Sequence, residues 1–389
     1  MEKKKIALIG TNGLPANYGG METLAEYLAK DLSKEYDLYC YCSKTPKEKR
    51  IKEYKGTTLI YVPLKANGLQ SIFYDGLTIL RSLRKYDVLV VLGCSCAFAL
   101  PFKKFFHKPI VLNAIGGREW EKVKGARLFA RIEIAVKRWM EGLQAKYPDF
   151  VIVDNAANLA AFEKKHHVKA LLAEYGGDHA QPEPITSEML EKYPFLFEPY
   201  DVTVSRAQED MNIHMVIDAY RHVPERRVVI VSNWQKTEYG QKLYTEYAGK
   251  YPNVILQNAI YNQKELNVVR SNATLYLHTH SMCGTAPSLV EAMYLNLPVI
   301  CFKVSTNLET TEHKSIYFET IPELVEILKG LDEATLARLK ADMKEIAVRR
   351  YQWKRISGIY QDCIAKCIKK YYERYRISRR IRHQTLPYY

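Results

Sequence analysis

The segment 278–293 combines a glycine-bearing loop, several hydroxyl side chains and one carboxylate. Gly284 and Thr285 precede Pro287, and Glu291 follows that proline by four residues. A loop that leads into a helix directs backbone N–H groups and partial positive charge at its mouth, which suits a phosphate. A carboxylate one turn further on repels a phosphate but accepts hydrogen bonds from the hydroxyls of a ribose or sugar. The alternative is a capped helix with a solvent-facing Glu291.

Flanking patterns predict the elements that hold this segment. Apolar runs at Ala273–Leu277 and Pro298–Cys301 predict buried strands, and Pro287–Leu295 predicts the helix between them. Another strand is predicted at Tyr200–Val204, and Arg206 follows its carboxyl end. A guanidinium placed there can bind a diphosphate through two parallel hydrogen bonds. A structural ion pair is the alternative for this arginine.

A second glycine-bearing loop, Gly10–Gly20, follows a predicted strand that begins at Lys5 and precedes a helical pattern at Met21–Lys34. Gly19 and Gly20 stand at the start of that helix, where they let another backbone or an anion come close. The spacing is not G-x-G-x-x-G, so the loop does not match the dinucleotide-binding motif. A plain turn is the alternative.

Strands and helices alternate along both halves of the chain, which predicts an α/β fold with two doubly wound, Rossmann-like domains. Ligands bind such sheets at the carboxyl ends of the strands. Arg118, Glu119 and Trp120 follow a predicted strand that ends at Asn113. They could bind sugar hydroxyls and stack on a sugar ring; a surface ion pair beside a packed indole is the alternative.

The predicted domains are residues 1–178 and 200–350, joined by a linker at 179–199 and followed by a basic helical segment at 351–389. The linker carries four prolines and several acids with little periodicity. A chain of 389 residues with 47% hydrophobic residues can build both domain cores.

The net charge of +14 is concentrated toward the two ends of the sequence. Basic residues exceed acids by 11 in residues 1–150 and by 8 in residues 351–389, whereas acids exceed bases by 5 between them. A basic surface suits a nucleic acid or an anionic membrane. No nucleic-acid-binding motif is recognised, so we expect an anionic membrane surface and no nucleic acid.

Apolar and aromatic residues recur at near-helical spacing among the basic residues of the last segment. They are Tyr360, Ile364, Ile368, Tyr371, Tyr372 and Tyr375. A basic helix with such a face can lie on an anionic bilayer. Packing of these side chains on the protein core is the alternative.

We expect a cytoplasmic protein, because no export signal or membrane-spanning segment is evident. The basic charge predicts that it is peripheral on the inner face of the cell membrane. Met1–Lys5 runs into a strand without the apolar region of an export signal, and the uncharged run Val88–Phe102 is too short to span a bilayer. The eight cysteines form no Cys-x-x-Cys pair, which favours reduced thiols. Cys94 and Cys96 lack matching ligands, so neither a metal nor another cofactor is expected.

These motifs resemble those of retaining glycosyltransferases of family 4, which have the GT-B fold. Residues 278–292 resemble their donor-site motif, and more narrowly that of a bacterial rhamnosyltransferase-type branch. The strongest similarity to the branch is the sequence Gly-x-x-Gly-Leu-Pro-Ala-x-Tyr-Gly-Gly-x-Glu-Thr at residues 10–23. The resemblance implies two sheets facing a cleft, with the last helix crossing back to the first domain.

The resemblance also implies roles for individual residues. Glu291 and Arg206 are the catalytic candidates. The donor-binding candidates are Gly19, Gly20, Arg206, Tyr261, His280, Gly284, Thr285 and Glu291. The acceptor-binding candidates are Arg118, Glu119 and Trp120.

Three positions depart from the family pattern. The wider family often has a glutamate where Cys283 stands and a lysine in place of Met211, and the branch usually has an aspartate in place of Gly116. No Asp-x-Asp motif occurs, so Arg206 and backbone N–H groups are expected to neutralise a diphosphate without a divalent ion.

The expected function is transfer of a sugar, such as L-rhamnose, from a nucleotide-diphosphate sugar to a glycan acceptor. The acceptor expected is linked to polyprenyl diphosphate, in the synthesis of capsule, exopolysaccharide or O-antigen. A nucleotide-sugar epimerase of the same fold is one alternative, which an acceptor requirement would distinguish. A basic nucleic-acid-binding protein is the other.

Overall fold

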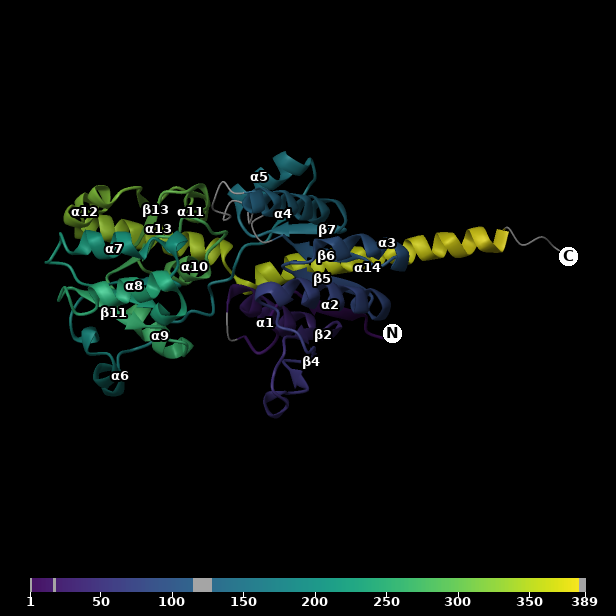
Figure 1. Cartoon of the computed structure of the whole chain (residues 1–389), viewed down its shortest axis with the longest axis horizontal. Helices are drawn as coiled ribbons and strands as arrows, with labels where there is room; N and C mark the ends of the chain where they lie inside the picture. The colour runs from purple at the N-terminus through teal and green to yellow at the C-terminus, as the bar shows by residue number, and fades with distance from the viewer. Residues whose placement is uncertain (1, 17–18, 115–127, 385–389) are drawn as a thin grey trace. The chain divides into compact units, whose positions relative to one another are not determined.

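The computed structural model describes residues 2–16, 19–114 and 128–384 and divides the chain into two compact units. Unit 1 comprises Met1–Asp154, Asn158–Ala173 and Lys354–Tyr389. Unit 2 comprises Asn155–Ala157 and Glu174–Trp353. Each unit is an α/β body built on its own sheet (Figure 1).

The sheet of unit 1 has the strand order β3-β4-β2-β1-β5-β6-β7-β8 in the described ranges, and all its neighbours are parallel except β3 and β4. The strands are β1 (Lys5–Ile9), β2 (Asp37–Cys42), β3 (Glu53–Tyr54), β4 (Thr57–Tyr61), β5 (Val88–Leu92), β6 (Ile110–Asn113), β7 (Phe150–Val153) and β8 (Leu171–Leu172). The central strand β5 is buried along its whole length, as expected for a parallel strand covered by helices on both faces.

The helices that accompany this sheet include one that returns from the far end of the sequence. They are α1 (Gly20–Leu32), η1 (Lys47–Lys49), η2 (Gly68–Gln70), α2 (Ser71–Lys85), η3 (Ala97–Phe102), α3 (Lys103–Phe106), α4 (Leu128–Lys146), α5 (Ala156–His166) and α14 (Trp353–Gln384).

The sheet of unit 2 is parallel throughout its described strands, in the order β11-β10-β9-β12-β13-β14. The strands are β9 (Asp201–Val204), β10 (Val228–Ser232), β11 (Val254–Asn258), β12 (Leu275–His278), β13 (Val299–Phe302) and β14 (Ile316–Phe318). The helices are α6 (Ser187–Lys192), η5 (Pro194–Phe197), η6 (Glu209–Met211), α7 (Ile213–Tyr220), η7 (Trp234–Lys236), α8 (Glu238–Tyr247), α9 (Gln263–Ser271), α10 (Pro287–Tyr294), α11 (Ser305–Thr310), α12 (Ile321–Lys329) and α13 (Glu333–Arg350). The predicted α/β class with two doubly wound sheets is confirmed.

Helix α14 packs on unit 1, which confirms that the last helix returns to the first half of the chain (Figure 1). Tyr360 and Ile364 are fully buried, and the amide of Asn113 on β6 donates a hydrogen bond of 2.8 Å to the Tyr360 hydroxyl. The prediction that Tyr360 and Ile364 face a bilayer is therefore wrong, because the protein core already covers them. Ile368 and Tyr371 are half-buried, and the side chains of Tyr372 and Tyr375 lie outside the described ones.

The segment 179–199 differs from the expected linker. It contains the short helices α6 and η5 and belongs to unit 2. Thr186 caps α6, because its hydroxyl accepts a hydrogen bond from the backbone N–H of Met189. Among the described helices, none combines the length and apolar character needed to cross a membrane.

Candidate functional site

Arg206 and His280 follow neighbouring strands of unit 2. Asp201 on β9 pairs with Leu275 on β12. Arg206 lies five residues after Asp201, and His280 lies five residues after Leu275. Burial and the nearby charge of Arg206 lower the pKa of His280 to about 3. Arg206 itself is exposed. The structure thus brings a solvent-accessible guanidinium and a neutral imidazole together at the carboxyl edge of the sheet.

The loop that carries His280 is fixed against the segment after β9. Ser281 donates two hydrogen bonds of 2.9 Å, from its backbone N–H and its hydroxyl, to the carbonyl oxygen of Asp210. Asn212 donates to the carbonyl of Thr279 at 3.0 Å, and the Thr279 hydroxyl donates to the carbonyl of Met211. Met211 is 3% exposed, so this position packs in the core and is unsuited to holding a charge toward a ligand.

Glu291 lies on α10, which begins at Pro287 in its first turn as predicted. The alternative of a solvent-facing glutamate is wrong, because this residue is only 8% exposed. One carboxylate oxygen accepts from the fully buried guanidinium of Arg270, and the other lies 3.1 Å from Nε2 of His179. Burial raises the pKa of Glu291, but Arg270 and His179 outweigh it and lower the pKa to about 2. The carboxylate is therefore ionised at neutral pH.

His179 is oriented by Trp353. The indole N–H of Trp353 donates a hydrogen bond of 3.0 Å to Nδ1 of His179. An indole nitrogen can only donate, so this contact assigns the ring proton of a neutral His179 to Nε2. Nε2–H then donates to Glu291, which gives the carboxylate two donors from opposite sides.

Thr285 belongs to a buried polar network within unit 2. The amide of Asn155 donates to the hydroxyls of Thr285 and Thr310 at 3.3 and 3.2 Å, and to the carbonyl of Thr306 at 3.1 Å. Thr285 is 4% exposed. Its hydroxyl therefore stabilises the loop before α10, and its backbone remains the part that could approach a ligand.

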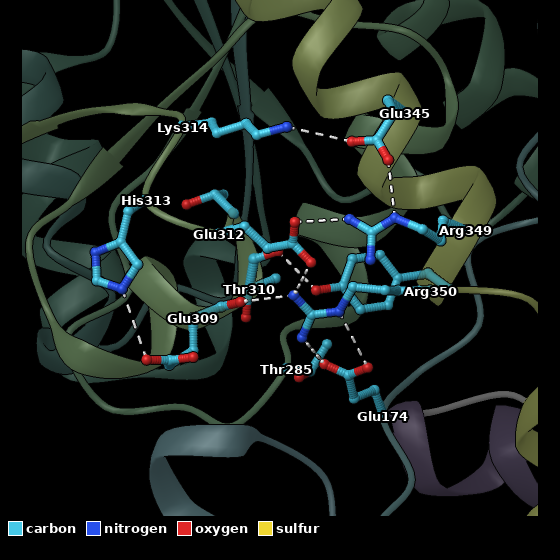
Figure 2. A network of polar contacts seen from close by, with 12 residues as sticks. Glu174, Thr285, Glu309, Thr310, Glu312, His313, Lys314, Glu345, Arg349 and Arg350 are labelled. Atoms are coloured by element: carbon cyan, nitrogen blue, oxygen red, sulfur yellow. Dashed lines mark hydrogen bonds and ion pairs between the residues drawn. The ribbon is translucent and has the colours of Figure 1, made fainter.

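An ion-pair network continues from Thr310 toward the end of α13 (Figure 2). Arg350 bonds Glu174 through two guanidinium nitrogens and also donates to a Glu312 oxygen at 2.8 Å. Arg349 bonds the other Glu312 oxygen at 2.6 Å. These contacts join Glu174, at the start of the long segment of unit 2, to Glu312 and to the end of α13.

The other unit 2 candidates are accessible. Gly284 is half-buried in the loop before α10, and Tyr261 is 77% exposed after the edge strand β11. Strand β10 separates β11 from β9 in the sheet. Tyr261 thus offers an accessible ring in the segment after the edge strand, as a ring that stacks on a base requires.

In unit 1, the glycines of the loop 10–20 have two different roles. Gly10 and Gly13 have φ values of +89° and +113°, and a Cβ at Gly10 would lie 2.9 Å from the carbonyl oxygen of Leu92. Gly19 is extended and exposed, and a Cβ there would meet its nearest neighbour, a Glu22 oxygen, at 3.4 Å. Backbone conformation and packing therefore require glycine at residues 10 and 13. They do not require it at residue 19, where a glycine would allow close approach of a ligand.

Gly20 is half-buried and begins α1. The loop before it is held by Glu22, whose carboxylate accepts hydrogen bonds of 2.9 Å from both the backbone and the side-chain amide of Asn12. The predicted acceptor residues Arg118, Glu119 and Trp120, and also Gly116, lie outside the described residues.

Sequence reasoning missed His179, Arg270 and Asn155 as parts of this site. His179 directly follows the Tyr-Gly-Gly-Asp motif at 175–178, which was a usable signal. Arg270 ends a polar helix, and its complete burial has no counterpart in the sequence pattern.

Two family matches cover most of the chain. Residues 3–178 match the Domain of unknown function (DUF1972), and residues 194–340 match Glycosyl transferases group 1. No curated protein matches this chain.

Several solved structures share the architecture of this chain at low sequence identity. HepE of Anabaena in complex with UDP-glucose has a TM-score of 0.72 at 16% identity, covering 93% of this chain and 100% of that one. Sucrose-phosphate synthase of Thermosynechococcus elongatus has a TM-score of 0.74 at 17% identity, covering 94% and 100%. WaaG, a glycosyltransferase involved in lipopolysaccharide biosynthesis, has a TM-score of 0.66 at 16% identity, covering 91% and 99%. The two units thus have the GT-B fold, and the match of residues 194–340 supports a glycosyltransferase.

Proposed function

We propose that this protein transfers a sugar from a nucleotide-diphosphate sugar to a glycan acceptor. The observation that carries the proposal is the arrangement at the edge of the unit 2 sheet. Arg206 and His280 follow adjacent strands, and the loop after His280 leads into α10, which carries an ionised Glu291. A guanidinium and a loop at a helix N-terminus suit a diphosphate, and an ionised carboxylate accepts hydrogen bonds from sugar hydroxyls.

In this proposal Arg206 binds the diphosphate, and Glu291 binds donor hydroxyls. Each oxygen of a carboxylate can accept about two hydrogen bonds. Arg270 and His179 take one on each oxygen of Glu291, so both oxygens can still accept from a hydroxyl. Tyr261 is the candidate for stacking on the base, and the backbone at Gly284 and at Gly19 for approach to the phosphates.

The finer assignment rests on the motif resemblance. It favours a retaining enzyme that adds L-rhamnose or another hexose to a lipid-linked glycan during capsule, exopolysaccharide or O-antigen synthesis. UDP-sugars are the first donors to test, because HepE binds UDP-glucose. The involvement of WaaG in lipopolysaccharide biosynthesis supports a glycan acceptor.

Unit 1 also carries the surface that we propose docks on an anionic membrane. Large apolar side chains that are 38–78% exposed gather on α2, η3, α3 and α4, elements that contact one another through η3. We call this the α2–α4 surface: Ile72, Phe73, Leu80, Phe98, Phe102, Phe105, Ile132, Val136 and Trp139. Several large exposed apolar side chains on helices that pack together are typical of protein or membrane contacts.

Charge favours the membrane as the occupant of the α2–α4 surface. The basic excess of residues 1–150 and that of residues 351–389 fall in the same unit. Each Lys or Arg near an anionic surface contributes about 1 kcal/mol within a Debye length. In this proposal the α2–α4 surface makes the apolar contact with the membrane. The sequence had assigned that contact to α14, which here supplies positive charge.

Thermal shift with a panel of nucleotide sugars tests the donor site, because a true donor stabilises the fold by mass action. We expect one nucleotide diphosphate and its sugar conjugates to raise Tm. Stabilisation by none of the panel would contradict the donor proposal.

Vesicle co-sedimentation tests the membrane surface. Wild type should sediment with anionic vesicles at low salt and be released at about 0.5 M salt, where screening shortens the attraction. Phe105→Ser combined with Trp139→Ser should weaken this binding, whereas Phe197→Ser, at an exposed phenylalanine of unit 2, should not. Equal sedimentation with neutral vesicles, or dimer formation that these changes abolish, would contradict the proposal.

A further inference from the structure

A cluster of two histidines and one cysteine lies at the end of β12. One ring nitrogen each from His278 and His280 and the Sγ of Cys283 all lie within 4.8 Å of one another. The two imidazole rings are 4.1 Å apart between centroids. The three residues come from one short segment in which β12 ends and the loop toward α10 begins.

His278 gives the second, independent observation. It is 1% exposed, and neither of its ring nitrogens has a hydrogen-bond partner among the described residues. A buried polar group without a partner costs on the order of 1–3 kcal/mol, so such groups are rare and call for a ligand or a function. A cation at the cluster would satisfy a nitrogen that the protein leaves unsatisfied.

We propose that His278, His280 and Cys283 bind one Zn²⁺ ion through two imidazole nitrogens and a thiolate. Imidazole and thiolate are ligands that zinc prefers, whereas Mg²⁺ and Ca²⁺ take oxygen ligands. Binding releases the Cys283 thiol proton to solvent. Three protein ligands leave the fourth tetrahedral position for water or another oxygen ligand.

The geometry requires only a small adjustment. With bond lengths of about 2.0–2.3 Å, the ligand atoms of tetrahedral zinc lie roughly 3.3–3.7 Å apart. The backbone is already fixed, since Asn307 donates hydrogen bonds to the carbonyls of His280 at 3.0 Å and of Phe302 at 2.8 Å. The Cys283 thiol donates a weak hydrogen bond of 3.8 Å to Oδ1 of Asn307, and this bond is lost when the thiol proton is released. The ligand atoms, which lie within 4.8 Å of one another, would have to approach by at most about 1.5 Å to reach these distances.

The positive charge of Arg206 opposes binding of a dication nearby, but this side chain is exposed and can turn toward solvent.

This proposal departs from the sequence-based expectation of no metal. That expectation rested on missing carboxylate motifs and on the isolated pair Cys94 and Cys96. The burial and orientation that bring His278, His280 and Cys283 together are not visible in the sequence.

Co²⁺ binding to the reduced full-length protein tests the site, because a thiolate on Co²⁺ gives a near-ultraviolet charge-transfer band. We expect one equivalent to bind, with the band lost in Cys283→Ser and kept in Cys94→Ser. Cys94 is the matched control, since it and Cys283 are the two half-buried cysteines, the other six being buried. Zn²⁺ should displace Co²⁺ stoichiometrically.

A second pair of variants keeps the test independent of Cys283. His280→Ala should weaken Co²⁺ binding at least tenfold, while the exposed His313→Ala should leave it unchanged. Circular dichroism checks that each variant is folded. No stoichiometric binding by wild type, or a band that survives Cys283→Ser, would overturn the proposal.

Discussion

Nε2 of His179 and Oε1 of Glu291 lie 3.1 Å apart, with the imidazole held from its other side by the indole of Trp353. Arg270 completes the arrangement from within the core of unit 2. A carboxylate fixed by two donors is pre-organised for binding hydroxyls, because it loses little freedom when a ligand arrives. The same contacts make Glu291 important for stability, which the sequence alone did not indicate.

The first prediction is that Glu291→Gln lowers sugar transfer and also lowers Tm. Loss of a charged hydrogen bond to donor costs about 1.5–3 kcal/mol, or roughly 10- to 150-fold in rate. Stability falls because the buried Arg270 keeps its charge and loses its counter-ion. Steady-state kinetics on the folded fraction and a melting curve measure the two effects.

A double variant separates the two roles of Glu291. Glu291→Gln with Arg270→Met removes both charges, so Tm should recover while transfer stays low. Full recovery of transfer in the double variant would mean that Glu291 only balances Arg270.

The second prediction concerns Arg206. Arg206→Ala should weaken binding of a nucleoside diphosphate at least tenfold and leave binding of the bare nucleoside unchanged, since the proposed function assigns the guanidinium to the phosphates. Calorimetry with UDP and uridine measures this difference. Arg221→Ala, at the end of α7, is the control. Equal losses for both ligands would make Arg206 a structural residue.

The third prediction compares two glycines of one loop. Gly19→Ala should fold with a Tm close to that of wild type and lose donor binding, because its Cβ meets only ordinary contacts within the protein. Gly10→Ala should lose stability, because its φ is +89° and its Cβ would collide with backbone. A Gly19→Ala variant with unchanged donor affinity would remove Gly19 from the candidate site.

The fourth prediction is a pH dependence in unit 1. Burial raises the pKa of Asp75 from 3.8 to about 6, although the Ser95 N–H donates to its carboxylate at 2.6 Å. Between these values the unfolded chain releases a proton that the native state keeps, so stability falls as pH rises, by about 1.4 kcal/mol per pH unit. Above pH 6 Asp75 is ionised in both states, so the loss of folding stability that it causes stays constant.

Asp75→Asn tests this linkage, because an amide oxygen still accepts from Ser95 and carries no charge. The variant should gain Tm relative to wild type on going from pH 4 to pH 7. A difference that does not change between these pH values would show that Asp75 is ionised in the native state at little cost.

The sequence predicted the sheets and the loop before α10, because hydrophobic periodicity and turn residues determine these features locally. The return of the last helix was implied only by the resemblance to the glycosyltransferase family. It could not predict that Glu291 is buried against Arg270, since two residues on different helices meet only after the fold forms. Tyr360 shows the same limit. The sequence correctly predicted a helix with Tyr360 on its apolar face. Whether lipid or protein covers that face depends on tertiary packing.

The most direct test of the proposed transferase is release of nucleoside diphosphate from the donor that stabilises the protein, with and without glycolipid extract as acceptor. We predict that the extract stimulates release and that the sugar appears in the lipid fraction. Conversion of the donor to an epimer without acceptor, or no consumption of any nucleotide sugar in the panel, would contradict the account.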